Sequence, residues 1–289
     1  MKFCDINIRD PFILPYDGKY YMYGTRANNT WERKPLESLG FDVYVSEDLE
    51  NWSEPKEIFS YFDGFWGDTQ YWAPEVHEYK GKFYLFASFT GKGYHRGTAI
   101  LVSDTPDGRF TEHSDKAITP RDWECLDGTF YVENGTPYIV FCHEWTQIKD
   151  GTVCYLELTL DLKNAVGEPV EMWKASTPSW VHSWSGNGDY VTDGPYMLRL
   201  DNELICIWSS FTEGNEYCEA ISRSDNGSIK GKWSIDEKLL FTKDGGHGMI
   251  FTDYKGNMNF VFHTPNSTPD ERPAIKILTN EDLKNETGF

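Results

Sequence analysis

Five copies of an aromatic-rich hairpin recur along the chain, and this repetition narrows the available folds more than any other feature. Each copy joins two strand-like runs through a polar turn, as in GHGMIFTDYKGNMNFVFHT at residues 246–264. A third strand-like run follows every hairpin, and several copies end in a fourth run around an aromatic residue, as in NWSEP and GKWSI. The turns are 53 to 68 residues apart and begin at Asp17, Lys80, Glu133, Asp201 and Lys255.

This period and this strand count are typical of propeller blades. Helical periodicity is weak throughout, and Gly and Pro are spread along the chain, as expected for many short strands. We therefore predict an all-β protein, a five-bladed β-propeller in which residues 1–289 form a single domain. A pair of β-sandwiches is the alternative, but that architecture would not require five matched hairpins.

The charge of the chain excludes two classes of partner. The 27 basic and 46 acidic residues give a formal net charge of −19. A surface this acidic repels nucleic acid and anionic lipid, so we expect no nucleic acid and no membrane as partners. Neutral ligands such as carbohydrates remain. Most of the 11 Trp, 17 Tyr and 18 Phe residues would fill a large core, and some could stack on sugar rings.

The cysteines and the N-terminus indicate a reducing compartment. None of the six cysteines forms a CxxC pair, which leaves zinc and redox motifs unsupported. The first residues, MKFCDINIRDPF, lack the apolar region of a signal peptide, and no segment has the length of a membrane span. We therefore expect free thiols and a cytoplasmic location, although a trimmed chain would look the same. The sequence leaves the oligomeric state open.

The residues that open the first strand of each copy carry the candidate chemistry. They are Asp10, Glu75, Asp127, Asp193 and His247. Because the innermost strands of a propeller line its central channel, these residues would converge at one end of the axis. Carboxylates gathered in a partly desolvated pocket push one another's pKa apart, so that one can stay protonated while another is ionised. Glycoside hydrolysis requires such a pair.

Each of these acids has a simpler interpretation when it is taken singly. Asp-Gly and Asp-Pro are ordinary turn formers, and most such residues have no chemical role. The recurrence of acids at the same point of several copies is what favours a site.

The motifs at these openings resemble those of glycoside hydrolase family 43. The matching segments are RDPFI with DGKYYMYGT, YWAPEVHEYKGKFYLF, LDGTFYVENGTPYIVF, DGPYML and GHGMIF, and they span residues 9 to about 262. The resemblance implies a five-bladed propeller and an inverting mechanism with three acidic residues. It implies that Asp10 is the general base that activates water. Asp127 would tune and orient the general acid, and Asp193 would be that acid.

The fourth motif departs from the family pattern in its acid. TDGPYM stands where the family has Glu-Gly-Pro, so the carboxyl of Asp193 has one methylene less reach. In inverting enzymes the two carboxyls lie roughly 6.5–9.5 Å apart, and an Asp needs more burial than a Glu to stay protonated. Three outcomes are open: Asp193 is a working acid, Glu75 or Glu144 substitutes for it, or the protein is catalytically weak. We favour the first.

Further residues are candidates for binding substrate or a metal ion. The candidates for substrate binding are Trp72, Glu75, Trp145, Trp184 and Arg272. The tryptophans could stack on a sugar face and the arginine could place a cation near the base, although core, rim or loop positions are the plainer interpretation. The resemblance places His247 on the axis near a bound cation or water, where carboxylates could hold Ca²⁺ through waters. A buried histidine bonded to backbone is an equal alternative. No cofactor is required for the chemistry.

Together these features predict an inverting, exo-acting glycoside hydrolase of plant cell-wall carbohydrate. By resemblance, the released sugar would be an α-L-arabinofuranosyl or a β-D-xylosyl unit. One alternative is a non-catalytic carbohydrate-binding propeller, which the shortened acid motivates. Another is a β-galactosyl- or galactofuranosyl-specific hydrolase of the same fold; a fructoside-specific one would show a WMNDPNG-type opening. The sugar, the linkage and the choice between exo and endo action stay open.

Overall fold

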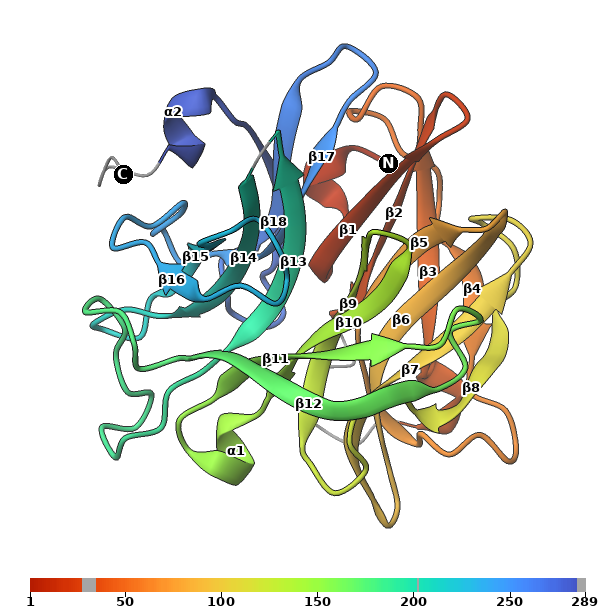
Figure 1. The fold of residues 1–289 in the computed structure, drawn as a ribbon. Coiled ribbons are helices and arrows are strands. Elements are labelled where there is room, and N and C mark those ends of the chain that lie inside the picture. The colour runs from red at the N-terminus through yellow and green to blue at the C-terminus, as the bar shows by residue number, and fades with distance from the viewer. Residues whose placement is uncertain (28–34, 202, 285–289) are drawn as a thin grey trace.

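The computed structural model describes residues 1–27, 35–201 and 203–284, which fold into five antiparallel sheets around a common axis. Figure 1 shows the sheets arranged radially, and the chain passes from one to the next in order. The predicted five-bladed β-propeller is therefore confirmed.

The first four blades have four strands each, and the strand nearest the axis comes first in the chain. Blade 1 contains β1 (Ile8–Tyr16), β2 (Lys19–Arg26), β3 (Gly40–Ser46) and β4 (Lys56–Ser60). Blade 2 contains β5 (Thr69–Tyr79), β6 (Lys82–Gly91), β7 (Tyr94–Ser103) and β8 (Thr111–Ala117). Blade 3 contains β9 (Cys125–Glu133), β10 (Thr136–His143), β11 (Thr152–Leu158) and β12 (Ala165–Lys174). Blade 4 contains β13 (Asp193–Leu200), β14 (Glu203–Phe211), β15 (Tyr217–Ser224) and β16 (Trp233–Ile235).

Blade 5 differs from the others because it has three strands within the described residues: β17 (Gly246–Thr252), β18 (Met258–Thr264) and β19 (Arg272–Ile277). After β19 the chain enters α2 (Asn280–Leu283) rather than a fourth strand, and a capping box between Thr279 and Asp282 begins this helix. The ring closes through the N-terminal segment, where the Asn7 side-chain amide donates to the carbonyls of Pro269 and Glu271. The other short helices within the described ranges are η1 (Phe3–Asp5), η2 (Leu36–Ser38) and α1 (Trp145–Ile148).

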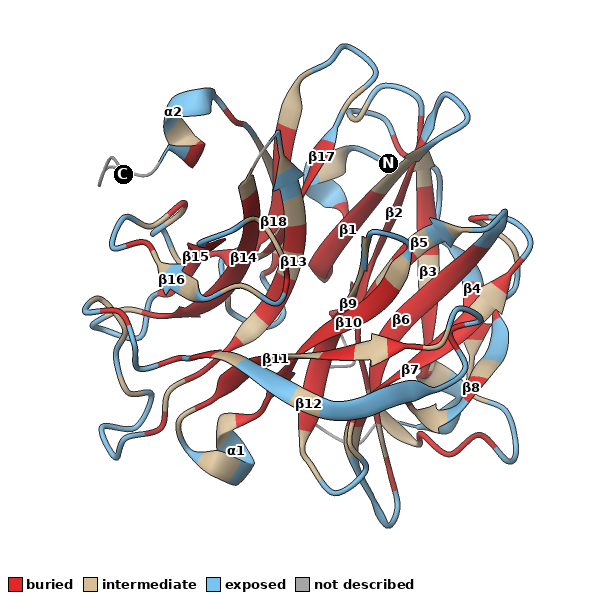
Figure 2. Cartoon of the chain, viewed as in Figure 1, coloured by how far each residue is buried: buried red, intermediate tan, exposed pale blue. Residues whose placement is uncertain are grey.

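Apolar side chains fill the spaces between neighbouring blades. Figure 2 shows in red that many residues of these strands are buried. The largest cluster joins blades 1 and 2 and includes Phe59, Tyr71 and Phe89, all buried. The rings of Tyr71 and Phe89 meet edge to face with centroids 4.8 Å apart, an arrangement that aromatic pairs prefer. Each buried side chain of this size stabilises the fold by roughly 1.5–3 kcal/mol, so the blades form a firm frame for the axis.

Every innermost strand contains a β-bulge near its start, and this repeated irregularity positions the site. The ladder between first and second strands shifts register across Arg9/Phe12, Trp72/Glu75, Asp193/Tyr196 and Gly246/Met249, and blade 3 has a matching shift. In each bulge one residue has left-handed backbone angles: Asp10 (φ 52°), Ala73 (φ 47°), Asp127 (φ 56°), Gly194 (φ 50°) and His247 (φ 49°). Such angles are uncommon outside glycine and cluster at functional sites, where bulges re-aim side chains.

Two smaller predictions concern the cysteines and membrane spans. All six cysteines are free thiols, and all except the exposed Cys4 are buried. No helix in the described part of the chain has the length and apolar character needed to cross a bilayer.

Candidate active site

A cavity of about 660 Å³ lies at the end of the axis where the bulges of the inner strands meet. Four of the five strand openings that were predicted to converge line it together: Asp10, Asp127, Asp193 and His247. The rest of the wall consists of Arg9, Thr25, Trp72, Arg96, Leu126, Glu144, Trp145, Thr146, Trp184, Val191, Phe211, Asn266 and Thr268. This volume is within the range of small-molecule sites.

Asp10, in the bulge of β1, is held as a carboxylate by its neighbours. The Thr25 hydroxyl donates to its Oδ2 atom at 2.6 Å, and the Nδ1 atom of His247 lies 3.2 Å from its Oδ1 atom. Burial works against the ionised form, but the cations of His247 and Arg9 outweigh burial and hold the pKa of Asp10 below its ordinary value. An ionised carboxylate at this position can accept a proton from water.

Asp127 and Asp193 have the opposite electrostatics. Burial raises the pKa of each carboxyl, and repulsion from nearby carboxylates adds to this effect, although the His247 cation opposes it. The backbone N–H of Gly194 donates to Asp127 Oδ2 at 3.1 Å, and the Tyr217 hydroxyl donates to Asp193 Oδ2 at 3.1 Å. Together these two carboxyls hold a proton more readily than Asp10 does.

His247 lies between the acids and carries a positive charge at neutral pH. Its Nδ1 atom is 3.2 Å from Asp10 Oδ1 and 3.8 Å from Asp127 Oδ2. Burial alone would lower its pKa, but the surrounding carboxylates, led by Asp10, raise the pKa to about 9. The backbone N–H of His247 donates to Ser209 Oγ at 2.7 Å, which fixes the bulge of β17.

The residues around His247 do not fit a directly bound metal ion. Among the described residues, no group of three or more His, Cys, Asp or Glu side chains is arranged to hold one. Moreover, the imidazolium Nδ1–H points at the carboxylates that a cation would otherwise take as ligands. A Ca²⁺ ion held only through water molecules stays a prediction.

A buried network behind Asp10 was not predicted. The Nδ1 atom of His263 accepts from the backbone N–H of Asp10 at 3.2 Å, and its Nε2 atom lies 3.2 Å from Asn266 Oδ1. Burial and the Arg9 cation lower the pKa of His263 to about 3, so this ring is neutral and carries its proton on Nε2. Arg9 donates to Asn266 and forms a 2.7 Å ion pair with the buried Glu271. The network fixes both the backbone and the charge environment of Asp10.

The three predicted tryptophans all line the cavity, in different surroundings. The guanidinium carbon of Arg96 lies 4.4 Å from the centroid of the Trp72 ring, so a cation covers one face of this ring. Trp145 packs against the small apolar cluster around Phe211. Trp184 is 42% exposed, and its ring centroid is 4.7 Å from that of Phe211. Trp184 is therefore the tryptophan most open to a ligand.

Two predicted residues are not in the cavity wall, and each position has a structural reason. Glu75 lies two residues beyond the left-handed bulge residue of β5, which is Ala73, and its carboxylate pairs with His77 at 2.9 Å. The expectation that Glu75 shares the pocket with the other openings is therefore wrong. Arg272 donates to the carbonyls of Pro269 and Glu271 and lies outside the wall, whereas Arg9 brings a cation to Asp10.

Sequence reasoning also missed Arg96, Tyr217 and His263. Arg96 lies on β7, in a segment without a recognisable motif. Tyr217 is the first residue of β15 and His263 lies near the end of β18, and both would be interpreted as core residues. Arg9, by contrast, could have been predicted as a site residue, because it directly precedes Asp10 in the first motif.

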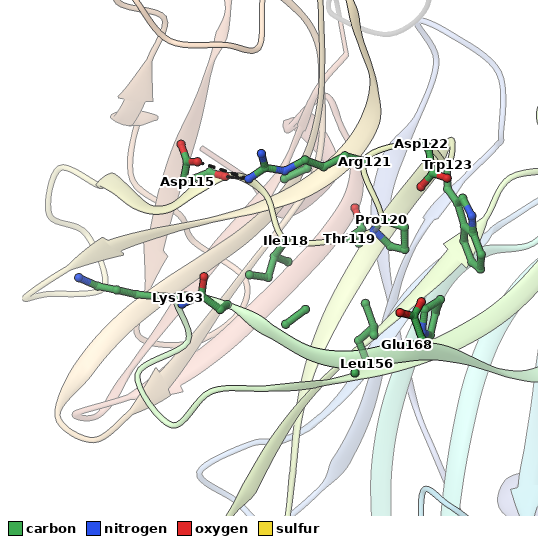
Figure 3. Close-up of a pocket in the computed structure, with 15 residues that line it drawn as sticks. Asp115, Ile118, Thr119, Pro120, Arg121, Asp122, Trp123, Leu156, Lys163 and Glu168 are labelled. Atoms are coloured by element: carbon green, nitrogen blue, oxygen red, sulfur yellow. Dashed lines mark hydrogen bonds and ion pairs between the residues drawn. The ribbon is translucent and has the colours of Figure 1, made fainter.

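A separate cavity of about 420 Å³ lies toward the outer edges of blades 2 and 3, as Figure 3 shows. In the figure Arg121 points toward Asp115, and its Nη2 atom donates to the Asp115 carbonyl at 2.7 Å. Trp123 stacks on His143 with ring centroids 4.0 Å apart, so one of its faces is covered. None of the strand openings lines this cavity, and it lacks the converging carboxyls of the axial one.

Comparison with known proteins agrees with this geometry. The exo-α-(1→5)-L-arabinofuranosidase of Streptomyces chartreusis is 25% identical over 178 residues, which are 59% of this chain and 53% of that protein. The chain spans about half the length of the first curated relatives that it matches.

Two solved structures from Bacteroides thetaiotaomicron VPI-5482 share the fold. An endo-arabinase is 39% identical with a TM-score of 0.89, and the match covers 96% of each chain. An endo-1,4-β-xylanase is 27% identical with a TM-score of 0.75, and the match covers 95% of this chain and 91% of that one. The family model described as glycosyl hydrolases family 43 matches residues 4–281, nearly the whole length, and the chain therefore belongs to this family.

Proposed function

We propose that this propeller hydrolyses α-L-arabinofuranosyl linkages, such as those of arabinan, with inversion at the anomeric carbon. The main support for the proposal is that two carboxyls of one cavity have pKa values shifted in opposite directions. The pKa of Asp10 is lowered and that of Asp193 is raised. The names of the similar proteins, an arabinofuranosidase and an endo-arabinase, support the choice of sugar. The β-D-xylosyl unit is the second candidate, supported by the similar xylanase.

In the proposed reaction Asp10 and Asp193 act on opposite sides of the scissile bond. The Asp10 carboxylate takes a proton from a water molecule, whose oxygen attacks the anomeric carbon. Asp193 donates its proton to the glycosidic oxygen as the carbon–oxygen bond breaks. Asp10 ends protonated and Asp193 ends ionised, and exchange with solvent restores both. Because water enters opposite the leaving group, the configuration at the anomeric carbon inverts.

The neighbouring groups suit these roles. Asp127 is among the carboxylates that surround Asp193, and its charge favours a proton on this acidic cluster. The hydroxyl of Tyr217 binds Asp193 Oδ2, so Oδ1 is the oxygen that would present the proton. The His247 cation favours the ionised form of Asp10.

A panel of 4-nitrophenyl glycosides tests the substrate and the acid together. The panel contains the α-L-arabinofuranoside, the β-D-xyloside, the β-D-galactofuranoside and the β-D-galactopyranoside. We expect turnover of the arabinofuranoside and a loss in Asp193→Ala that is larger on a natural arabino-oligosaccharide, because 4-nitrophenolate needs little protonation. Proton NMR of the first product should show the inverted anomer. Retention of configuration would contradict the mechanism.

Digestion of linear arabinan distinguishes exo from endo action. The sequence predicts the exo mode. An exo enzyme releases arabinose alone, whereas an endo enzyme releases oligosaccharides and lowers the viscosity early. The similar endo-arabinase makes this measurement necessary.

A sugar-binding propeller without catalysis is the second candidate function, and the shortened acid of the fourth blade favours it. Asp193→Glu restores the side chain that the family motif carries. Activity that appears in Asp193→Glu but is absent in the parent, together with calorimetric sugar binding by the parent, would support this candidate.

A further inference from the structure

An ion pair in the wall of the axial cavity has no assigned contact with the sugar in the reaction described above. Arg96 on β7 of blade 2 and Glu144, which directly precedes α1 of blade 3, form this pair. Both side chains line the cavity, with exposed fractions of 12% and 8%. Charges buried to this extent are costly unless they are paired or used, so the pair needs an explanation.

The pair leaves hydrogen-bonding capacity unused on both partners. Arg96 Nη1 and the Thr146 hydroxyl both donate to Glu144 Oε2, so Oε1 has no donor among the described residues. Arg96 Nε and Nη2 donate to Gln70 Oε1 at 3.2 Å and 3.0 Å. A guanidinium has five N–H groups, and one on Nη1 and one on Nη2 therefore have no acceptor within the described structure.

The guanidinium is held firmly in place. Its central carbon lies over the Trp72 ring, 4.4 Å from the ring centroid, and the backbone N–H of Arg96 donates to Glu124 Oε2 at 2.9 Å. A hydrogen-bond donor and an acceptor that are both fixed in place can select a polar ligand by the direction of its hydrogen bonds, and not by its charge alone. The backbone N–H of Glu144 donates to the Glu124 carbonyl at 2.8 Å, which anchors the second partner as well.

The order of the blades places this pair beside the proposed reaction. Asp10 belongs to blade 1 and Asp193 to blade 4, so the line of attack crosses the axis between these blades. The sugar ring must lie to one side of that line. Blades 2 and 3 occupy one side with Arg96 and Glu144, and blade 5 occupies the other with His247.

We propose that Arg96 and Glu144 together bind two neighbouring hydroxyl groups of the glycone sugar. Glu144 Oε1 accepts from one hydroxyl, and a free N–H of Arg96 donates to the other. The pair thereby selects sugars whose adjacent hydroxyls match the spacing of the two side chains. This assignment rests on the proposed glycosidase function and adds the residues that choose the glycone.

The alternative is that the Arg96–Glu144 pair only links blades 2 and 3 and does not contact the sugar. Two variants distinguish this structural role from sugar binding. Glu144→Gln removes the charge at nearly constant shape. The double variant Arg96→Met, Glu144→Leu replaces the pair with apolar side chains, which often leaves stability unchanged or improved. Asp236→Asn is the matched control, because Asp236 pairs with Arg223 at 2.9 Å and comparable burial in blade 4, outside the cavity.

The experiment compares kcat and KM on 4-nitrophenyl α-L-arabinofuranoside and on analogues that lack the 2- or the 3-hydroxyl. We expect Glu144→Gln to raise KM about 10- to 100-fold with a smaller change in kcat, because a charged hydrogen bond to the sugar is lost. On the analogue that lacks the contacted hydroxyl, the same substitution should cost less than about threefold, since residue and hydroxyl act through one bond. The double variant should lose sugar affinity while its melting temperature stays near that of the parent, and Asp236→Asn should leave KM unchanged.

Equal losses on the full glycoside and on every deoxy analogue would overturn the proposal, because no hydroxyl would then be coupled to the pair. A loss confined to oligosaccharides, with the aryl glycoside unaffected, would also overturn it, since the contact would then be with the leaving group. Failure of the proposed function looks different. The parent would then turn over another glycone of the panel, and the same comparison on that glycone decides the role of the pair; a parent that neither hydrolyses nor binds any of these sugars overturns both.

Discussion

The two sides of the axial cavity hold the same side chain, an aspartate, in opposite electrostatic surroundings. On the side of blades 1 and 5, Asp10 lies 3.2 Å from the His247 cation and 3.9 Å from Arg9, and its pKa is lowered. On the side of blade 4, Asp193 accepts a bond from the neutral Tyr217 and is repelled by Glu144, and burial raises its pKa. The proposed base and acid therefore differ by their neighbours and not by their residue type.

The difference in pKa between Asp10 and Asp193 follows from how the blades of the propeller are joined. Arg9 is fixed by Glu271 and Asn266 at the closure between blades 1 and 5, so a cation stands beside Asp10 in the folded chain. Arg96, which lies on blade 2, instead donates to Glu144 and Gln70. The ring closure thus brings one arginine to the base, while the second arginine in the cavity wall is paired with Glu144.

The largest expected effect comes from removing the charge on the Asp10 side. Asp10→Asn should lower kcat by about 10²- to 10⁴-fold, which is the usual contribution of a general base. The amide keeps the shape and can still accept from Thr25, so the fold should persist. Steady-state kinetics and circular dichroism on the same preparation check this, and a kcat within threefold of the parent would remove Asp10 from the proposed role.

The second prediction concerns the His247 cation, which lies between the two sides of the cavity. His247→Gln should raise the pKa of Asp10 and those of Asp127 and Asp193, because the imidazolium lowers all three. Both limbs of the profile of kcat/KM against pH should move upward, by roughly one unit. His77→Gln is the control, since His77 pairs with Glu75 outside the cavity and should leave both limbs in place.

The third prediction concerns stability rather than rate. His247 has a folded-state pKa of about 9, above its ordinary value of 6.5, so its charge stabilises the fold fully below pH 6.5. This stabilisation, about 3 kcal/mol at most, is lost as the pH rises through 9. The difference in unfolding free energy between the parent and His247→Gln, measured in urea from pH 6 to 10, should shrink with pH. A difference that stays constant would show that the imidazole is neutral throughout.

The smallest effect is expected at the rim. Trp184 is partly exposed and stacks on Phe211, so Trp184→Ala should change stability little. If this ring contacts a neighbouring sugar unit, kcat/KM on an arabino-oligosaccharide should fall roughly two- to tenfold, the range of one aromatic contact. The 4-nitrophenyl glycoside, which has no second sugar, should be unaffected, and equal losses on both substrates would place Trp184 against the glycone instead.

The repeated hairpins determined the fold because propeller blades are nearly independent units with a local pattern. The turns at Asp17 and Lys255 join strands that are neighbours in the chain, so strand order could be inferred without long-range information. Extending the four-stranded repeat to blade 5 would place a fourth strand after β19. The chain after Thr279 forms a capped helix there, a local signal that the repeat concealed.

The sequence by itself determined which openings carry acids, and four of its five strand openings line one cavity. Only the tertiary structure decided that Glu75 lies outside it, because the pairing of β5 with β6 places the bulge at Ala73 and not at Glu75. Only the tertiary structure brought His263 and Glu271 to Asp10 and Arg9, across more than 250 positions of chain. The physical reason is that motifs record local backbone geometry, whereas a pKa is set by burial and by charges that only folding brings together.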